Sequence, residues 1–237
     1  TLYWAHGHPK HHSNEDDGQI GCVLNSLYNR DPMSHGHINF TRCGLPIDVQ
    51  KRIGEKFWGS PDTVDAIGDY TPTNIYKMKR LQWVVARKEL HDMLGICSWT
   101  APWEVSPLRE KGYIGDIEME SKVFRAVTGI EMTQDDLDKA GLRAFILQRL
   151  YTMRQLKSRN PRQDHDQYPE WIFWDPKGKA PFTKGTIRME RSDIEKSFDL
   201  FYGLMDFDVK TGAPTEKSLK EYGLDFALST MKQEGLM

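Results

Sequence analysis

Apolar residues recur at helical spacing along most of the chain, and this pattern begins near residue 48. The clearest stripe consists of Ile75, Met78, Leu81 and Val85, and it continues to His91. Residues three and four positions apart lie on one face of an α-helix, so the stripe predicts an amphipathic helix. The sequence contains no strictly alternating segment longer than a few residues, and we therefore expect a mainly α fold.

Three further helices are predicted from their boundary signals. Thr133-Gln-Asp-Asp136 resembles a capping box with Asp in the usual Glu role, and Ser192-Asp-Ile-Glu195 resembles a second one. The last predicted helix begins after Pro214-Thr215 and ends near Gly223. The apolar stripes that should face the core of the first two helices are Leu137, Gly141, Ala144, Leu147 and Tyr151, and then Ile194, Phe198, Phe201 and Met205.

Two segments lack this periodicity. The first 46 residues are rich in Gly, His, Asn and Asp, and long structureless segments are typically functional loops or parts that require a partner. Residues 157–190 combine a polar, proline-bounded stretch with several turn signals, so we interpret them as a long surface loop. A lid, an interface and an inert crossover all stay open for this loop. We therefore predict an irregular active-site-type segment over residues 1–46 and a helical domain over residues 47–237.

Composition and charge narrow the class of protein. A hydrophobic share of 38% and a charged share of 28% indicate a soluble globular chain. The net charge of −2 leaves no electrostatic footprint for nucleic acid. Apolar runs are too short for a membrane span and no signal peptide opens the sequence, so we expect a cytoplasmic protein without a membrane partner. The first residue is Thr1 in place of Met, which suggests an upstream segment outside this sequence.

The six residues Asp92-Met-Leu-Gly-Ile-Cys97, at the end of the strongest predicted helix, carry the clearest chemical signal. A carboxylate accepts hydrogen bonds from the donor edge of a fused nitrogen heterocycle. A glycine lets the backbone approach a planar ligand closely, and a thiolate is a soft ligand for iron. Taken alone, these residues are explained more simply by a solvated carboxylate, a helix C-terminus and a small hydrophobic side chain.

These six residues resemble the D-x-x-G-L-C motif of the aldehyde ferredoxin oxidoreductase family, with Ile96 in place of Leu. The resemblance continues downstream, in order, through residues 128–137, 140–143, 148–154, 159–169 and 201–224. The sequence departs from the family pattern at Leu142, where Glu is usual, and at Asp206-Phe207, where Gly-Trp is usual. The resemblance covers most of the chain from about residue 74 to residue 224, which makes a chance match of one short motif a poor explanation.

The resemblance implies a function. Members of this family oxidise an aldehyde to a carboxylic acid and pass electrons to ferredoxin or another electron carrier. They hold tungsten (or molybdenum) between two pterin dithiolenes, beside a 4Fe–4S cluster. By resemblance, Asp92 binds pterin, Gly95 allows the backbone to come close to it, and Cys97 is the fourth ligand of the iron–sulfur cluster.

The family also places a catalytic histidine upstream of the motif, in an Asp- and His-rich segment like residues 29–39. Either His35 or His37 is therefore implied to move a proton near the metal. A structural role for both histidines stays open, because the alignment in this segment is loose.

Three features of the complete enzymes do not occur in this sequence: the C-x-x-C-x-x-x-C cluster loop, the N-terminal pterin-binding sheet domain and the first D-x-x-G-L-D motif. An iron–sulfur cluster needs four ligands, whereas the chain has three cysteines, and we interpret Cys22 and Cys43 as small buried residues. We expect a C-terminal portion that is completed by a missing N-terminal region or a separate subunit. The surface around the motif, with Trp99 and Trp103 exposed, would then also allow a homodimer.

Two alternative functions stay open at this point. Within the same family, the alternative is a benzoyl-coenzyme A reductase-like catalytic subunit, which would use related cofactors to reduce a ring. In a different class, it would be a helical interaction module that has lost the cofactor. The presence of Asp92, Gly95 and Cys97 together argues against the module.

Overall fold

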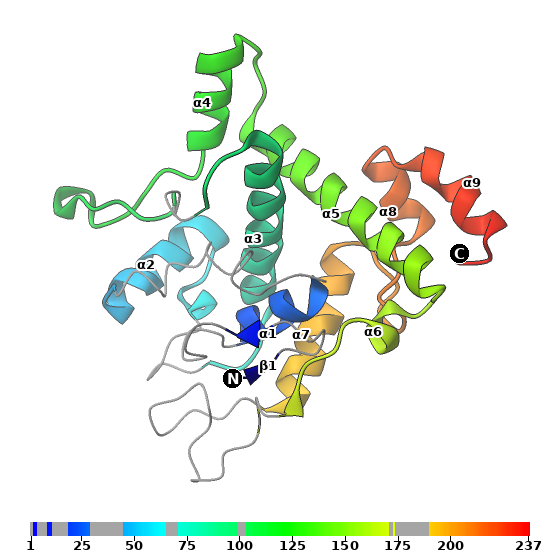
Figure 1. Cartoon of the computed structure of the whole chain (residues 1–237). Coiled ribbons are helices and arrows are strands. Elements are labelled where there is room, and N and C mark those ends of the chain that lie inside the picture. Colours follow the sequence, from blue (N-terminus) through cyan, green and yellow to red (C-terminus); the bar gives the residue numbers. More distant parts are fainter. Residues whose placement is uncertain are drawn as a thin grey trace.

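The computed structural model describes the backbone of residues 2–3 and 9–10, and residues 19–28, 45–64, 71–98, 103–170, 173 and 190–237. A mainly α fold is confirmed in this part of the chain (Figure 1). Its α-helices are α1 (Gln19–Leu27), α2 (Ile47–Trp58), α3 (Ile75–Leu94), α4 (Met119–Thr128), α5 (Gln134–Leu156), α6 (Pro161–Asp164), α7 (Arg191–Leu204), α8 (Glu216–Glu221) and α9 (Asp225–Gln233). Two single 3-10 turns, η4 (Pro61–Thr63) and η5 (Arg109–Lys111), and a short antiparallel pair, β1 (Leu2–Tyr3) with β2 (Pro9–Lys10), complete the described elements.

Helix α3 lies at the centre of the molecule and packs against α5, α7 and α1 (Figure 1). Its predicted stripe is confirmed, since Met78, Leu81 and Val85 are fully buried. The crossing of α3 and α5 is close because α5 presents Gly141, where an added Cβ would stand 2.1 Å from the carbonyl oxygen of Ala86. A glycine is therefore required at this crossing, and the position of α3 against α5 follows from it.

The predicted capping box at the start of α5 is confirmed. The backbone N–H of Asp136 donates to Thr133 Oγ1 over 3.1 Å, and the N–H of Thr133 donates to Asp136 Oδ2 over 3.0 Å. The second half of its predicted stripe is wrong, because Leu147 is 43% exposed and Tyr151 is 60% exposed. Helical spacing fits two adjacent faces here, and packing selects the one that buries Ile146, Leu150 and Met153.

Helix α7 buries the predicted stripe, but the predicted capping box at its start is wrong. The helix begins at Arg191 after Glu190, which makes no side-chain capping bond. Ser192 therefore lies inside the first turn. Glu195, its supposed partner, accepts instead from Arg162 Nη2 over 2.8 Å and from the hydroxyl of Tyr168. Contacts with a distant segment have outweighed the local capping pattern.

The irregular segment predicted over residues 1–46 contains a helix, α1, and this corrects the prediction for residues 19–27. Ile20, Val23, Leu24 and Leu27 recur at the spacing of one helix face, and packing also buries the polar residues of α1. Gln19 shows how its polar groups are satisfied: Nε2 donates to Asp193 over 3.0 Å, and Oε1 accepts from Lys77 Nζ over 2.7 Å. His35, His37 and Cys43 lie outside the described residues.

The surface loop predicted over residues 157–190 is wrong for its first part. Residues 161–164 form α6, and His165 and Asp166 behind it are buried. Asp166 is held by Arg149, whose Nη1 and Nη2 donate to its two carboxylate oxygens over 3.0 and 2.5 Å. This polar stretch can be buried because the charge of Asp166 is paired with that of Arg149. Residues 174–189 lie outside the description.

The predicted helix after Pro214-Thr215 is confirmed as α8, with the Thr215 side chain accepting from the N–H of Ser218. It is not the last helix, since α9 follows and packs against it. Arg154 on α5 forms an ion pair with Glu234, which directly follows α9, and this pair links the two helices. Among the helices that the structure describes, none is long and apolar enough to cross a membrane.

Candidate functional site

The Asp92–Cys97 motif forms the C-terminal end of α3. The helix ends because Gly95 takes a left-handed conformation with φ of 69°, which favours glycine. The carbonyl oxygen of His91 accepts the N–H of Gly95 and, over 2.9 Å, the N–H of Ile96. A Cβ added at Gly95 would meet nothing within 4 Å, so the space beside this glycine is open in the described structure.

The motif lies at the surface. Asp92, Gly95 and Cys97 are exposed, as are the two apolar residues between them, Met93 and Leu94. The Asp92 carboxylate accepts from Lys88 Nζ, one turn earlier on α3, over 2.5 Å. The C-terminal end of α3 thus presents the carboxylate of Asp92, the open space at Gly95 and the thiol of Cys97 within six residues.

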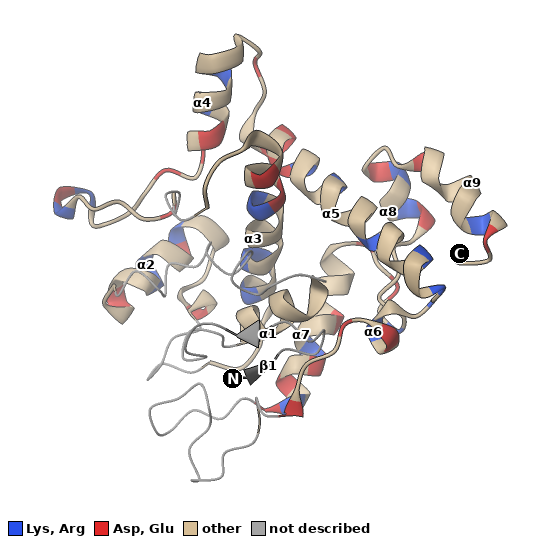
Figure 2. Ribbon diagram, viewed as in Figure 1, with Lys and Arg blue, Asp and Glu red and all other residues tan. Residues whose placement is uncertain are grey.

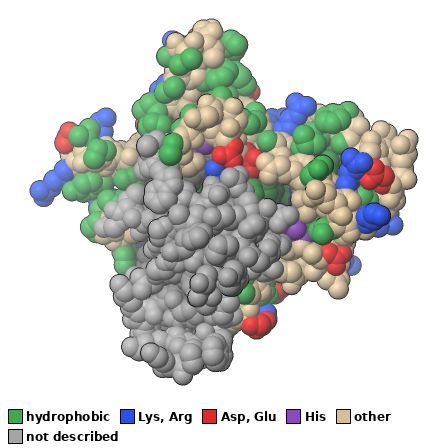
Figure 3. Space-filling view, viewed as in Figure 1, with side chains coloured by type: hydrophobic (Ala, Val, Ile, Leu, Met, Phe, Trp, Pro, Cys, Tyr) green, Lys and Arg blue, Asp and Glu red, His purple; other side chains and the backbone are tan. Residues whose placement is uncertain are grey.

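Exposed apolar side chains also occur on α4, which stands apart from the main body of the molecule in Figure 1, and directly after it. Val127 is 79% exposed and Ile130 is 56% exposed, and Figure 3 shows hydrophobic side chains over this helix. Trp103 is half-buried, which corrects the prediction that it is exposed. Trp99 lies outside the described residues. Acidic and basic residues are mixed along the ribbon of α3 and α4, so these helices carry no run of a single charge (Figure 2).

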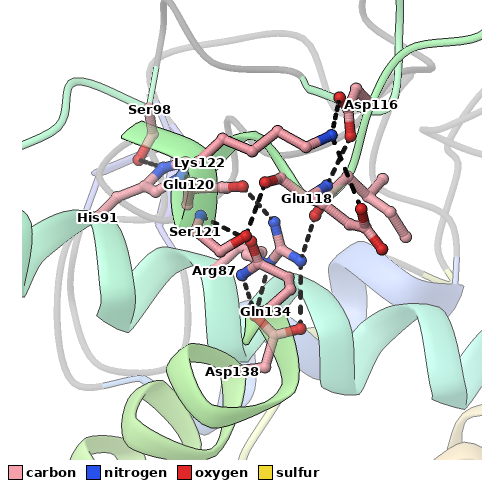
Figure 4. Close-up of polar contacts among 11 residues, drawn as sticks. Arg87, His91, Ser98, Asp116, Glu118, Glu120, Ser121, Lys122, Gln134 and Asp138 are labelled. Atoms are coloured by element: carbon pink, nitrogen blue, oxygen red, sulfur yellow. Dashed lines mark hydrogen bonds and ion pairs between the residues drawn. The ribbon is translucent and has the colours of Figure 1, made fainter. Parts of the chain in front are cut away.

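A buried polar cluster lies directly behind the motif, and Figure 4 shows its members pointing toward one another. We call it the Arg87 cluster, and its members are Arg87, His91, Ser98, Glu120 and Asp138. These residues come from α3, the turn after it, α4 and α5. The cluster therefore joins the motif to two neighbouring helices.

Arg87 holds the cluster together. Its Nη1 donates to Glu120 Oε2 over 2.5 Å, its Nε to Asp138 Oδ1 over 2.7 Å, and its Nη2 to the carbonyl oxygen of Ile117 over 2.7 Å. The guanidinium also lies over the ring of Trp83, 5.0 Å from its centre. Every face of the buried cation is thus occupied, which is the condition under which a buried charge is tolerated.

Burial and hydrogen bonding oppose one another at the two carboxylates of the cluster. Burial raises the pKa of Glu120, but hydrogen bonds from His91 and Arg87 outweigh it, and the pKa lies below its ordinary value. At Asp138 burial prevails over the attraction of Arg87, and the pKa is raised. Glu120 is accordingly the ionised partner of Arg87 at neutral pH.

Glu104 lies in the irregular hairpin of residues 103–116, which is closed by a bond from the N–H of Ser106 to Tyr113 O over 2.8 Å. Its side chain is fully buried, and neither carboxylate oxygen has a hydrogen-bond partner among the described residues. Burial raises the pKa of Glu104 to about 7, although the backbone N–H of Glu104 itself and the charges of Arg80 and Arg87 oppose the shift. A buried carboxyl without a side-chain partner is uncommon in folded proteins.

The predicted site residues have different outcomes. The structure brings Asp92, Gly95 and Cys97 together on one turn, but it does not test the binding roles assigned to them. His35 and His37 lie outside the described residues. Among the described residues there is no group of three or more His, Cys, Asp or Glu side chains that could hold a metal ion.

Sequence reasoning missed His91, Glu104 and Glu120. His91 was read as the end of an apolar stripe, and the other two belong to segments with no assigned role. A single charged residue gives no signal in the sequence that it is buried, because charged side chains are mostly exposed, so these residues could not be found from the sequence.

A family model described as aldehyde ferredoxin oxidoreductase, domains 2 and 3, matches residues 35–224. The chain belongs to the aldehyde ferredoxin oxidoreductase family. The match confirms the resemblance drawn from the motifs and extends it upstream of residue 74, to include α2. It also crosses residue 46, and the division of the chain at that position stays a prediction. The chain is thus part of an oxidoreductase of this family, and the motif lies inside the matched range.

Proposed function

We propose that the chain supplies one wall of the active site of a cytoplasmic, tungsten-pterin and iron–sulfur oxidoreductase that converts an aldehyde to a carboxylic acid. Electrons would pass to ferredoxin or a similar carrier. One observation carries the proposal: in a chain of this family, the Asp92–Cys97 motif stands exposed at the end of α3. A surface turn with this donor set is suited to a cofactor that other parts of the enzyme cover.

The residues present fit the cofactors as one side of a shared site. The exposed Asp92 carboxylate can accept hydrogen bonds from a pterin edge, and Lys88 balances its charge. The open space at Gly95 admits a planar group against the backbone. The exposed Cys97 can offer a thiolate to iron. When bound, the tungsten (or molybdenum) bis-pterin supplies the redox chemistry and Lewis acidity.

The chain cannot supply the cluster ligands alone. A 4Fe–4S cluster is held by four thiolates, and the sequence has three cysteines. Cys22 is fully buried among the core residues of α1. We therefore propose that the remaining thiolates and the second pterin contact come from a missing N-terminal region or a separate subunit.

The decisive experiment is Cys97→Ser in the intact enzyme. A serine hydroxyl is a poor iron ligand, so iron content and the paramagnetic signal of the reduced cluster should fall while the helical circular dichroism stays unchanged. Cys22→Ser and Cys43→Ser are the controls and should leave both iron readouts alone. Unchanged iron in Cys97→Ser would refute the ligand assignment.

Metal analysis also separates this proposal from the cofactor-free module. The intact enzyme should contain tungsten or molybdenum together with iron, whereas the chain alone should purify without stoichiometric amounts of any of them, because a partial site loses the chelate geometry. An intact enzyme without these metals would favour the module. Stoichiometric metal on the chain alone would refute the shared site.

A further inference from the structure

His91 connects the motif to the protein interior through both its backbone and its ring. Its carbonyl oxygen accepts the amides of Gly95 and Ile96, before Cys97 in the chain. Its ring Nδ1 lies 3.2 Å from the Oγ of Ser98, directly after Cys97. Residues on both sides of the exposed Cys97 are thus hydrogen-bonded to His91, which is fully buried.

The ring of His91 is itself held on its other side. Nε2 lies 3.0 Å from Glu120 Oε1, and the second oxygen of Glu120 accepts from Arg87. Because burial is outweighed by these hydrogen bonds, the pKa of Glu120 is low and the carboxylate is ionised and only accepts. Nε2 therefore carries a hydrogen that it donates to Glu120. In the neutral ring Nδ1 is then the acceptor, and the Ser98 hydroxyl donates to it.

Burial sets this chain of bonds apart from the motif that it supports. Cys97 is exposed, whereas Ser98, His91 and Glu120 are buried. Glu120 is also the one buried residue of α4, a helix whose other side chains are half-buried or exposed. Glu120 therefore joins α4 to the core through its bonds to His91 and Arg87, beside a bond from the N–H of Ser121 to Gln134 on α5.

We infer that Ser98, His91 and Glu120 are positioning residues, which fix the Cys97 thiol at the end of α3 and link its position to that of α4. The inference rests on the proposed role of Cys97 as a cluster ligand. Hydrogen-bonded groups behind a ligand orient it and tune the reduction potential of an iron–sulfur cluster. The Ser98 hydroxyl, one residue from the thiol, is the nearest such group in the sequence.

The first test measures amide hydrogen exchange in the chain itself, by mass spectrometry of peptides that cover residues 92–98. Ser98→Ala removes one hydrogen bond from the turn, so the amides of Gly95 and Ile96 should exchange about fivefold faster or more. Ser98→Thr keeps the hydroxyl and should restore the wild-type rate. Unchanged exchange in Ser98→Ala would overturn the inference.

A matched pair of histidine variants controls for loss of stability. His91→Leu should also accelerate exchange at Gly95 and Ile96. His165→Leu removes a second buried histidine, which is bonded to the Asp166 carboxylate over 2.9 Å, and should leave these two amides alone. Equal acceleration in both variants would show a general loosening and would contradict a specific role for His91.

The second test uses the intact enzyme and the reduction potential of its cluster. Ser98→Ala should shift the potential while iron content stays normal, and Ser98→Thr should not. An unshifted potential in Ser98→Ala would overturn the inference. The two proposals fail separately: if Cys97→Ser keeps its iron while Ser98→Ala still accelerates exchange, the ligand role falls and the hydrogen-bonded attachment stands.

Discussion

Two buried clusters in this molecule each combine an arginine and a histidine with at least one carboxylate, but they differ in what surrounds them. The Arg87 cluster reaches the surface motif through Ser98 and lies near Glu104, whose carboxylate lacks a hydrogen-bond partner in the described structure. The second, which we call the Arg149 cluster, consists of Arg149, His165, Asp166 and Tyr202.

The hydrogen bonds of the Arg149 cluster close around the carboxylate of Asp166. Arg149 donates through Nε to the carbonyl oxygen of Gly212 over 2.7 Å, and through its other two nitrogens to Asp166. The hydroxyl of Tyr202 and the Nδ1 of His165 also meet that carboxylate. The cluster thus joins α5, the segment after α6, α7 and the turn before α8, which is a structural task. The clusters differ in their carboxyl groups: Asp166 accepts four hydrogen bonds from Arg149, His165 and Tyr202, whereas the Glu104 side chain beside Arg87 has no side-chain partner among the described residues.

The largest effect should come from breaking the closed cluster. Asp166→Asn leaves the buried Arg149 cation without its counter-charge, and such a loss typically costs about 3–5 kcal/mol of unfolding free energy. Denaturant unfolding of the chain measures it. Arg154→Gln, which breaks the solvent-exposed pair with Glu234, is the control and should leave the unfolding free energy nearly unchanged. Similar small losses for both variants would contradict the structural role.

The next largest effect concerns the pH dependence of stability. The pKa of Glu104 is raised in the folded state, whereas that of Asp166 is lowered. The pKa of Glu104 rises from 4.5 to about 7 on folding, because burial penalises the ionised form. The folded state therefore holds the extra proton, and stability should decrease as pH rises through this window, by about 3 kcal/mol in all. Glu104→Gln should remove this decrease and make the chain more stable than wild type at pH values above about 7.

Asp166 provides the contrast within the same pH titration. Burial alone would raise its pKa, but Arg149 and His165 lower it below the ordinary 3.8. Its contribution to stability is present above that value and is lost as pH falls through the lowered pKa. Unfolding curves of wild type and Glu104→Gln that stay parallel between pH 4 and 8 would refute the assignment of the neutral-range dependence to Glu104.

The smallest effect, and the one that extends the comparison beyond the described residues, concerns His35 and His37. Replacing the one that transfers a proton with Asn should lower the turnover of the intact enzyme by roughly a hundredfold, the usual scale for a lost general acid or base. Metal content should stay normal. Wild-type turnover in both single variants across neutral pH would remove the proton-transfer role from this segment.

The sequence by itself determined the class of fold, the course of α3, the cap of α5 and the family. Each of these depends on information within one segment: apolar spacing, a Thr–Asp pair that closes on itself, and a run of motifs in fixed order. The motif was also visible, because Asp92, Gly95 and Cys97 lie within six residues of one another. A sequence pattern predicts the structure correctly when the interactions that produce it join residues close together in the chain.

Tertiary structure decided the rest, because it depends on partners far apart in the chain. Glu195 forms no cap, because Arg162 and Tyr168 bind it. The polar residues of α1 are buried with its apolar face, and Gln19 is bonded to groups far away in the chain. Asp166 enters the interior only because Arg149 meets it there. Glu120 likewise becomes the support of the Cys97 turn only when α4 brings it to His91 and Arg87. The free energy of a buried charge is set by the groups around it, and the sequence does not state which groups those will be.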